Sequence, residues 1–249
     1  MLGLVQGAAE VFPVSSSAQL ALLPWLAGWQ QPDDRTRFAA GLHLGSAAGM
    51  ALALRDDVRS LTPHDVRRIA LSSAPAALAG LLLQGVVERR LGRPGPTAAL
   101  LAISGAGLWM ADSRAGNDRC PVDARATRKG GQSSHRGMVA ASLAQVLALA
   151  PGVSRTGATL TALRARGVPR DEALRASLLM SLPVTAGAAG LTAVRGGSVP
   201  PLLPTALAGL SAYVTARRVR PSRGFVVASV AYRLGVAAAV AAKLRKEQG

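Results

Sequence analysis

Acidic, aromatic and cysteine residues are all scarce in this chain of 249 residues. Its 13 Asp and Glu stand against 29 Lys and Arg, which leaves a net charge of +16. A basic excess of this size is typical of nucleic-acid binding. However, aromatic residues, on which base stacking depends, form only 3% of the chain, and the basic residues cluster between apolar segments, so we expect no nucleic-acid partner. The single Cys120 excludes an intrachain disulfide and lacks the partners of a structural zinc site.

Charged residues are also scarce, at 17% of the chain, where a soluble protein has about a quarter. Apolar segments close to the roughly 20 residues that span a bilayer recur along the sequence. A soluble helical bundle rich in alanine is the alternative, but its helices would carry charged residues at helical spacing, and these segments do not. The sequence therefore predicts an all-α integral membrane protein. The predicted spans are residues 38–54, 69–87, 96–111, 173–194, 200–216 and 225–242.

Two polar motifs interrupt the apolar sequence and resemble one another. In residues 6–17 and again in residues 145–157, a Gln lies eight residues before a Val-Ser pair, with a Pro just ahead of the turn. A second pair of similar segments, residues 71–75 and 179–183, follows in the same order. Two such echoes predict an internal repeat, a common feature of membrane proteins built from inverted halves.

Each polar motif lies between two apolar pieces that are too short to span a membrane alone, and its Pro and Ser residues break the helix. We interpret each pair of pieces as a re-entrant helical hairpin with its tip at membrane depth. Three full transmembrane helices follow each hairpin, so the two halves must have opposite orientations. The predicted arrangement is one membrane domain, 1–249, with a first inverted repeat over 1–111, a basic cytoplasmic linker over 112–136 and a second inverted repeat over 137–249.

The Arg and Lys residues predict the orientation of this arrangement. Twice as many of them lie on one face of the membrane as on the other, while Arg155 and Arg233 lie within membrane segments. The positive-inside rule makes the richer face cytoplasmic. The first hairpin then enters from outside and the second from the cytoplasm, so we expect their tips to meet near the middle of the membrane.

Glu10 and Arg155, one in each motif, are rare formal charges inside apolar sequence. Charges held in a membrane are costly, so they indicate a site for a charged substrate. A structural Glu–Arg pair that braces the two hairpins is the alternative. The neighbouring residues favour the substrate site, because hydroxyl groups, glycine backbone and a guanidinium all bind phosphate. Helices that begin at hairpin tips also direct their positive dipole ends toward an anion.

Other polar residues of the membrane segments have less definite roles. Gln6 lies one helical turn before Glu10 on the same face, where it can hold a water while Glu10 accepts a proton. Gln145 occupies the same place in the second motif, without an acid beside it, and we expect it to be scaffolding. His43 is interpreted as a packing residue, because a lone His on an apolar helix is more often that than a base. Arg233, in the last span, either braces the site or contacts phosphate.

These motifs resemble those of the undecaprenyl-diphosphate phosphatase family, integral membrane enzymes linked to bacitracin resistance. The (Glu/Gln)-x-x-x-Glu motif of the family corresponds to Gln6 and Glu10, and its Pro-Val-Ser-Ser segment corresponds to residues 13–16. Its Pro-Gly-x-Ser-Arg-Ser/Thr-Gly-x-Thr motif corresponds to residues 151–159. The resemblance covers almost the whole chain.

The resemblance implies hydrolysis of a polyprenyl diphosphate to the monophosphate, at the outer side of the bacterial plasma membrane, to recycle the lipid carrier of cell-wall synthesis. It also implies a divalent cation, Mg²⁺ or Ca²⁺, and a homodimer. We expect Glu10 to act either as a metal ligand or as the base, assisted by Gln6. One position departs from the family, because Gln19 stands where the family commonly has His. Gln cannot transfer a proton as imidazole does, so either Glu10 handles the proton alone, or activity is weakened, or His43 substitutes.

The predicted mechanism is phosphoryl transfer by positioning and charge neutralisation. Ser16 is the predicted nucleophile, or else positions water, with Glu10 as base and Arg155 holding the diphosphate. The alternative function is a lipid-phosphate transporter, because inverted repeats with paired hairpins are a common transporter design. The residues predicted to bind the substrate are Gln6, Ser15, Ser17, Gln19, Gly152, Ser154, Thr156, Gly157, Thr159 and Arg233.

Overall fold

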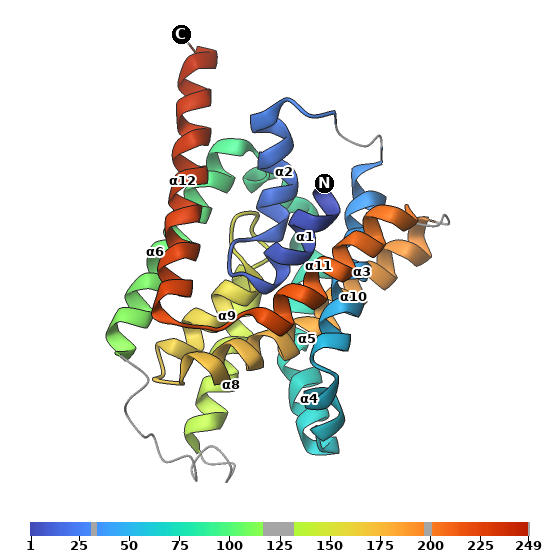
Figure 1. Cartoon of the computed structure of the whole chain (residues 1–249), viewed down its shortest axis with the longest axis vertical. Helices are drawn as coiled ribbons and strands as arrows, with labels where there is room; N and C mark the ends of the chain where they lie inside the picture. The colour runs from blue at the N-terminus through green and yellow to red at the C-terminus, as the bar shows by residue number, and fades with distance from the viewer. Residues whose placement is uncertain (31–33, 117–131, 197–200, 249) are drawn as a thin grey trace.

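The chain folds into helices in the computed structural model, which describes residues 1–30, 34–116, 132–196 and 201–248. No strand occurs in these ranges, so the all-α prediction is confirmed (Figure 1). Cys120 and most of the predicted basic linker lie outside the described residues. The helices are α1 (Leu2–Val11), α2 (Ser16–Ala27), α3 (Arg35–Ala53), α4 (Arg55–Ser60), α5 (Pro63–Leu91), α6 (Pro94–Ala115), α8 (Gln132–Leu147), α9 (Arg155–Arg164), α10 (Arg170–Gly196), α11 (Leu202–Arg218) and α12 (Arg223–Gln248).

The first polar motif forms the turn between α1 and α2. α1 ends at Val11 because Pro13 follows, and the residue before a proline is forced into extended backbone. Phe12 accordingly has φ −70° and ψ 141°. Ser15 then adopts left-handed backbone with φ 64°, a conformation uncommon for residues other than glycine, and α2 begins directly after it.

The second polar motif forms the turn between α8 and α9. Gly152 has φ 102° in this turn, a backbone conformation that residues with a side chain rarely adopt. Ser154 is the N-cap of α9, because its hydroxyl oxygen accepts a hydrogen bond from the backbone N–H of Gly157 at 3.1 Å. Both polar motifs therefore break a helix and start a new one, as their Pro, Ser and Gly residues predict.

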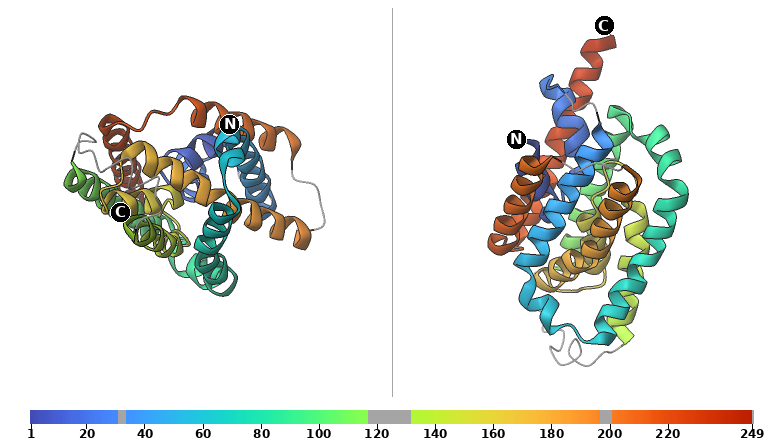
Figure 2. Two further views of the ribbon diagram at one scale, coloured as in Figure 1. Left: turned by 90° about the horizontal axis from the view of Figure 1, so that it is seen from below. Right: turned by 90° about the vertical axis from the view of Figure 1, so that its right-hand side faces the viewer.

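α11 lies beside both α1 and α3 and packs against each of them (Figures 1 and 2). The helices approach closely because glycines face the contact. A Cβ atom on Gly7 would overlap the carbonyl oxygen of Ala208, and a Cβ atom on Gly49 would overlap that of Gly209. Small residues allow helix backbones to approach in this way in membrane proteins. Backbone contacts with α11 therefore help to set the position of α1 relative to α3.

α9 lies among the other helices, where it packs against α6, α8 and α10. Its Leu160 and Leu163 belong to a buried apolar cluster that also contains side chains of α1, α3, α6 and α12. The turn after α1 reaches the same cluster, since the ring of Phe12 stacks on that of Phe225 with centroids 5.2 Å apart. The N-terminal turn of α9 is thereby held close to the end of α1.

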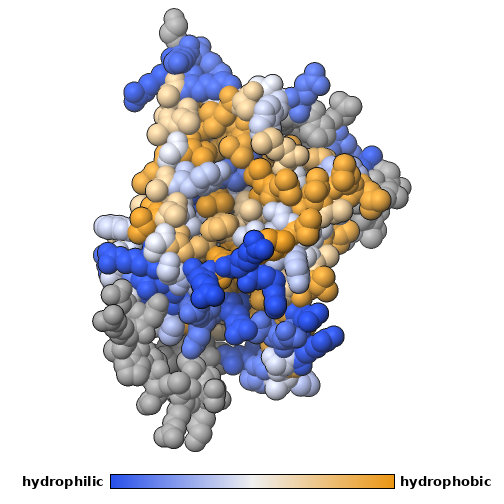
Figure 3. Space-filling model, viewed as in Figure 1, coloured by the Kyte–Doolittle hydropathy of each residue, from blue (hydrophilic) through white to orange (hydrophobic). Residues whose placement is uncertain are grey.

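The surface of α5 has the reverse of the usual polarity. Its buried positions include Ser72 and Ser73, whereas Leu71, Leu78 and Leu82 are between 60% and 70% exposed. Apolar side chains continue over much of the surface and separate hydrophilic regions at the two ends of the molecule (Figure 3). An apolar surface of this extent indicates contact with lipid.

Two helices of the described residues are long and apolar enough to cross a membrane by length and composition, α5 and α12. The other predicted spans do form helices, but they contain much Ala, Gly and Ser, which lowers their mean hydropathy. Two such helices are weak evidence on their own, because the core helix of a soluble protein can pass the same test. The exposed leucines of α5 make the lipid-facing interpretation the stronger one.

The positions of the helix ends agree with the prediction that most Arg and Lys residues lie on one face of the membrane. The connection between α4 and α5, the end of α6 and the start of α8 lie toward the lower end of Figure 1, and the connection between α11 and α12 lies above them, at about the height of α9. The connection between α5 and α6 and the end of α12 lie toward the upper end, and Figure 2 agrees. Most of the segments with the larger basic share therefore gather at one end of the molecule.

Two details differ from the sequence analysis. α6 continues to Ala115 and α8 begins at Gln132, so helices extend into both ends of the predicted linker. The similar segments 71–75 and 179–183 lie on α5 and α10, the second and the first long helix after their respective helix pairs. Their positions in the two halves are therefore not equivalent, and this echo does not support the repeat. The two segments instead contact each other, with the Ser73 hydroxyl 3.5 Å from the Met180 carbonyl oxygen.

Candidate active site

The carboxylate of Glu10 is the centre of a buried polar cluster to which three helices contribute. Its Oε1 atom lies 2.8 Å from Gln6 Nε2 on the preceding turn of α1, 2.8 Å from Ser16 Oγ at the start of α2, and 2.8 Å from His43 Nδ1 on α3. Gln6 is fully buried and Glu10 is 5% exposed. A carboxylate in such surroundings requires hydrogen-bond donors, because an unpaired buried charge is costly.

The two carboxylate oxygen atoms of Glu10 are used unequally. Oε1 is close to all three donor groups, whereas Oε2 has no hydrogen-bond partner within the described residues. Oε2 is also not one of the enclosed polar atoms that lack a partner, so it faces accessible space. Gln6 Oε1, in contrast, is enclosed and has no partner within the same part of the chain. The free Oε2 of the carboxylate that Ser16 contacts is therefore available to a proton donor or a cation.

Local sequence explains how α1 and α2 bring these groups together. Gln6 and Glu10 share a helix face because four residues separate them. The left-handed backbone of Ser15 then turns the chain so that Ser16 faces Glu10. The Ser15 and Ser17 hydroxyls, both predicted to bind substrate, lie 3.3 Å from each other and have no hydrogen bond to the Glu10 carboxylate in the described structure.

The N-terminal turn of α9 joins this cluster from the second half of the chain. Thr156 Oγ1 donates to the backbone carbonyl of Glu10 at 2.8 Å. Arg155 is partly buried, donates from Nη1 to Thr185 Oγ1 on α10 at 2.5 Å, and interacts electrostatically with Glu10. No direct ion pair joins Arg155 and Glu10 among the described residues. The structure thus brings the two charges to one region without the direct Glu–Arg brace that was the structural alternative.

Other predicted substrate-binding residues of the second motif shape the backbone. The Ser154 hydroxyl caps α9, and the Thr159 hydroxyl lies 2.9 Å from the carbonyl of Arg155, to which it donates. The carbonyl of Gly152 accepts from Ser104 Oγ of α6 at 3.2 Å. Ser154 and Thr159 are buried, and these contacts use their hydroxyls within the protein.

Arg233 lies apart from the Glu10 carboxylate, toward α6. Its Nη1 donates to Ser104 Oγ at 3.1 Å, and its Nη2 is packed so closely on Gly157 that a Cβ atom there would overlap it. The side chain is fully buried, and Nε and Nη2 have no hydrogen-bond partner among the described residues. A buried guanidinium with two unused donors, set against the positive end of a helix, is unfavourable without an anion nearby.

Gln19 has no contact with the Glu10 cluster among the described hydrogen bonds. Its Nε2 donates to the Val14 carbonyl at 2.8 Å, and its Oε1 accepts from the Tyr232 hydroxyl at 2.7 Å. The side chain is fully buried. The structure therefore places this predicted substrate-binding residue as a link between α2 and α12.

Comparison with known proteins identifies the family of the chain that carries these residues. Residues 1–238 match the family described as "Bacitracin resistance protein BacA". The chain belongs to this family. As a family member with an apolar surface and apolar helices, it is a membrane protein.

Curated relatives that carry the name undecaprenyl-diphosphatase are similar over most of the chain. The protein of Geobacter sulfurreducens is 37% identical over 204 residues, which cover 76% of this chain and 72% of the relative. That of Trichlorobacter lovleyi is 38% identical over 231 residues, 85% of this chain and 80% of the relative. That of Gemmatimonas aurantiaca is 35% identical over 234 residues, 86% of this chain and 84% of the relative.

His43 is the residue of this BacA family member that sequence reasoning undervalued. It was interpreted as a packing residue, yet its ring lies 2.8 Å from the carboxylate at the centre of the site. The available signal was that His43 is the single histidine in a predicted span, on a helix whose Gly45 and Gly49 allow close packing. These sequence features do not predict which helix, or which residue of that helix, the His43 ring contacts.

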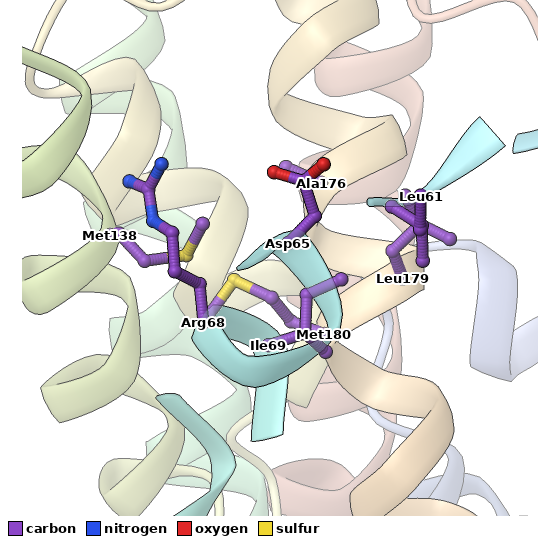
Figure 4. A pocket seen from close by; sticks show the side chains of 8 residues that line it. All are labelled: Leu61, Asp65, Arg68, Ile69, Met138, Ala176, Leu179 and Met180. Carbon is purple, nitrogen blue, oxygen red and sulfur yellow. The ribbon is translucent and has the colours of Figure 1, made fainter. Parts of the chain in front are cut away.

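The cavity shown in Figure 4 is separate from this site. It measures about 160 Å³ and lies between the start of α5, α8 and α10, with Asp65 and Arg68 as its charged side chains and Met138 and Met180 among its apolar ones. None of the predicted site residues lines it. The cavity therefore plays no part in the function proposed below.

Proposed function

We propose that this chain hydrolyses undecaprenyl diphosphate to undecaprenyl phosphate and inorganic phosphate, and so recycles the lipid carrier of cell-wall synthesis. The relatives named undecaprenyl-diphosphatase support the substrate and the reaction. One observation in the structure carries the proposal: the hydroxyl of Ser16 donates at 2.8 Å to the buried carboxylate of Glu10. A nucleophile within hydrogen-bond reach of a base is the arrangement that phosphoryl transfer to a hydroxyl requires.

The proposed chemistry begins with Ser16. Its Oγ attacks the terminal phosphorus, Glu10 takes the hydroxyl proton, and the bond from that phosphorus to the bridging oxygen breaks, which releases the lipid monophosphate. Glu10 passes this proton to the bridging oxygen of the departing lipid monophosphate. Water then attacks the phosphoserine, Glu10 takes a proton from that water, and the bond from phosphorus to Ser16 Oγ breaks. Inorganic phosphate leaves, and Glu10 returns the proton to Ser16 Oγ. Arg155 neutralises the phosphoryl oxygens, and the start of α9 directs its positive dipole end toward them.

Arg233 is proposed to contribute to the phosphate subsite. Its Nε and Nη2 are buried without partners in the described structure, and it is packed against the N-terminal turn of α9 next to Arg155. A diphosphate that reaches this turn would supply the missing acceptors. Guanidinium groups suit this purpose because they bind phosphate oxygens in a planar, two-pronged manner.

A divalent cation, Mg²⁺ or Ca²⁺, is proposed as the cofactor. The residues present fit it, because the free Oε2 of Glu10 is a carboxylate oxygen, the type of ligand that these cations prefer, and it is not enclosed. The described residues contain no cluster of three or more His, Cys, Asp or Glu side chains. This agrees with a Mg²⁺ ion held by one carboxylate together with substrate phosphates and water. When bound, the cation would neutralise charge on the diphosphate.

The finer architecture is also a proposal. We infer that α1 with α2, and α8 with α9, are re-entrant hairpins of two inverted halves in the bacterial plasma membrane. The lengths of α1 and α9, 10 residues each, support this because about 20 residues are needed to span a bilayer. The basic helix connections support a cytoplasmic lower end and a site that opens to the outside. The working unit is proposed to be a homodimer.

The decisive experiment measures phosphate release from a polyprenyl diphosphate by the purified chain. We expect activity in the native protein, a loss of about 100- to 10,000-fold in Glu10→Ala, and a loss of about 100- to 1,000-fold in Arg155→Ala. Glu88→Ala, at an exposed glutamate of α5, is the matched control and keeps its activity. A native protein without phosphate release, or Glu10→Ala and Arg155→Ala as active as Glu88→Ala, would show the proposal to be wrong.

The transport alternative is not favoured, because the curated relatives carry the name of a hydrolase. The same purified chain separates the two functions when it is placed in vesicles. Movement of the lipid diphosphate between leaflets without phosphate release would favour transport.

A further inference from the structure

The contacts of Gln19 prevent it from acting as a proton carrier in this chain. Both ends of its amide are occupied, by the Val14 carbonyl at 2.8 Å and by the Tyr232 hydroxyl at 2.7 Å. The side chain is fully buried and joins α2 to α12. The position where the family commonly has His therefore serves here as a link between helices.

His43 supplies an imidazole to the same carboxylate from a different helix. It reaches Glu10 Oε1 from α3, with Nδ1 at 2.8 Å, and its side chain is 24% exposed. The same oxygen also accepts from Ser16 Oγ on α2 and from Gln6 Nε2 on α1, each at 2.8 Å. The carboxylate group is thus held from α1, α2 and α3 at once.

The short contacts assign a proton to Nδ1 of His43. One Nδ1 atom cannot both accept from Gln6 Nε2, which is 3.0 Å away, and donate to Glu10 Oε1, which is 2.8 Å away. A carboxylate oxygen only accepts, so Nδ1–H donates to Glu10, while Gln6 donates to the same oxygen. Three donors on Oε1 fix the rotation of the carboxylate and leave Oε2 directed at accessible space.

We propose that His43 is a positioning residue for phosphate release, which holds Glu10 so that its free oxygen and Ser16 keep their productive geometry. This role rests on the phosphatase function proposed above. It requires an N–H donor at this place and no proton transfer by the ring. A displacement of about 1 Å in a reacting group costs on the order of 100-fold in rate, so the hold of His43 on Glu10 has kinetic consequences.

The test compares substitutions at His43 in the full chain, with a polyprenyl diphosphate as substrate and phosphate release as the readout. His43→Leu removes the donor, and we expect kcat to fall by about 10- to 100-fold while KM changes by less than about threefold. His43→Gln keeps an N–H donor of similar reach, and we expect it to recover at least about one tenth of the native kcat. His64→Leu, at an exposed histidine near the start of α5, is the matched control and keeps native kcat.

Each result has a distinct meaning. If His43→Leu is as active as His64→Leu in a protein that does release phosphate, the role of His43 is wrong and the proposed function stands. If His43→Gln loses as much kcat as His43→Leu, or if KM rises while kcat is unchanged, the positioning role is also wrong. The Gln variant keeps the polarity of the site, so it answers the question even if His43→Leu does not fold. A native protein without phosphate release overturns the proposed function together with this role.

Discussion

Among the described residues two carboxylates are buried, Glu10 and Asp112, and their surroundings are opposite in kind. Asp112 Oδ1 accepts from Arg164 Nε and Arg170 Nε, both at 2.8 Å, and its Oδ2 accepts from Arg170 Nη2 at 2.8 Å. Glu10 has three donors on one oxygen, all from side chains that are neutral or can be, and none on the other within the described residues. Both carboxylate oxygens of Asp112 therefore accept hydrogen bonds, whereas Oε2 of Glu10 can still accept one from a ligand.

The remaining groups around Asp112 are also satisfied. Arg164 Nη1 donates to the Val168 carbonyl at 2.7 Å, and Arg164 Nη2 donates to the Gly116 carbonyl at 2.9 Å. This cluster ties the end of α6 to the end of α9 and the start of α10. A buried acid is therefore not by itself a sign of catalysis. The unused oxygen of Glu10 distinguishes a site for chemistry from a structural ion-pair cluster.

The strongest test of this comparison removes Asp112. Asp112→Ala leaves two buried guanidinium groups without their anion, so we expect a loss of about 3–5 kcal/mol in the free energy of unfolding. In thermal denaturation of the purified protein the midpoint should fall by about 10 °C, while kcat of the folded fraction at low temperature stays close to native. Glu10→Gln should show the opposite pattern, with kcat lost and the midpoint nearly unchanged.

A matched control for Asp112→Ala exists at the same end of the molecule. Asp57 accepts from Arg175 Nη2 at 2.7 Å, but the Arg175 side chain is 64% exposed. Asp57→Ala should cost no more than about 1 kcal/mol, as is usual for an exposed ion pair. Equal losses in Asp57→Ala and Asp112→Ala would mean that burial does not distinguish the two clusters.

Arg233 gives the second test, because it is a buried charge that is only partly satisfied. Arg233→Met removes a cation with two unused donors, so stability without substrate should be unchanged or higher. If these donors bind the diphosphate, KM for a polyprenyl diphosphate should rise by about 10- to 100-fold, as expected from the loss of a charged hydrogen bond worth about 1.5–3 kcal/mol. An unchanged KM with lower thermal stability would make Arg233 a structural residue.

Gln19→His is the test with the smallest expected effect. Imidazole cannot reproduce both hydrogen bonds of the Gln19 amide, so thermal stability should fall by an amount equivalent to about 1 kcal/mol. We expect no gain in phosphate release, because the position faces Val14 and Tyr232 and not the Glu10 carboxylate. A large gain would instead show that the missing imidazole limits the enzyme, and that the surroundings of Gln19 rearrange to admit it.

The sequence predicted the parts of this molecule that depend on local chemistry. Pro13 and Gly152 mark the turns where helices break, and Glu10 and Arg155 are recognisable as costly charges within apolar sequence. Gln6 and Glu10 share a face through simple helical spacing, and the structure places Ser16 beside them. These features require only the neighbouring residues to be known.

Contacts between distant helices could not be predicted in the same way. His43 meets Glu10 only because α1 and α3 have a particular relative position, which no local pattern specifies. Asp112 was assigned to the predicted linker because polar residues without an apolar period follow it. Its partners, Arg164 and Arg170, lie more than fifty residues away, so no local pattern could show that it is buried between them. The similarity between residues 71–75 and 179–183 does not reflect a structural repeat for a related reason. Similar sequence segments need not occupy equivalent positions in a fold.

The glycines that face α11 have a consequence for how this protein tolerates change. Gly7 lies between Gln6 and Glu10 along α1, and Gly49 lies on the helix that carries His43. A single methyl group at either position would overlap the α11 backbone and so displace α1 or α3, the helices that carry Glu10 and His43 of the proposed active site. The geometry of the proposed active site thus depends on two glycines that make no polar contact with it. These glycines are among the residues that we expect to tolerate substitution least.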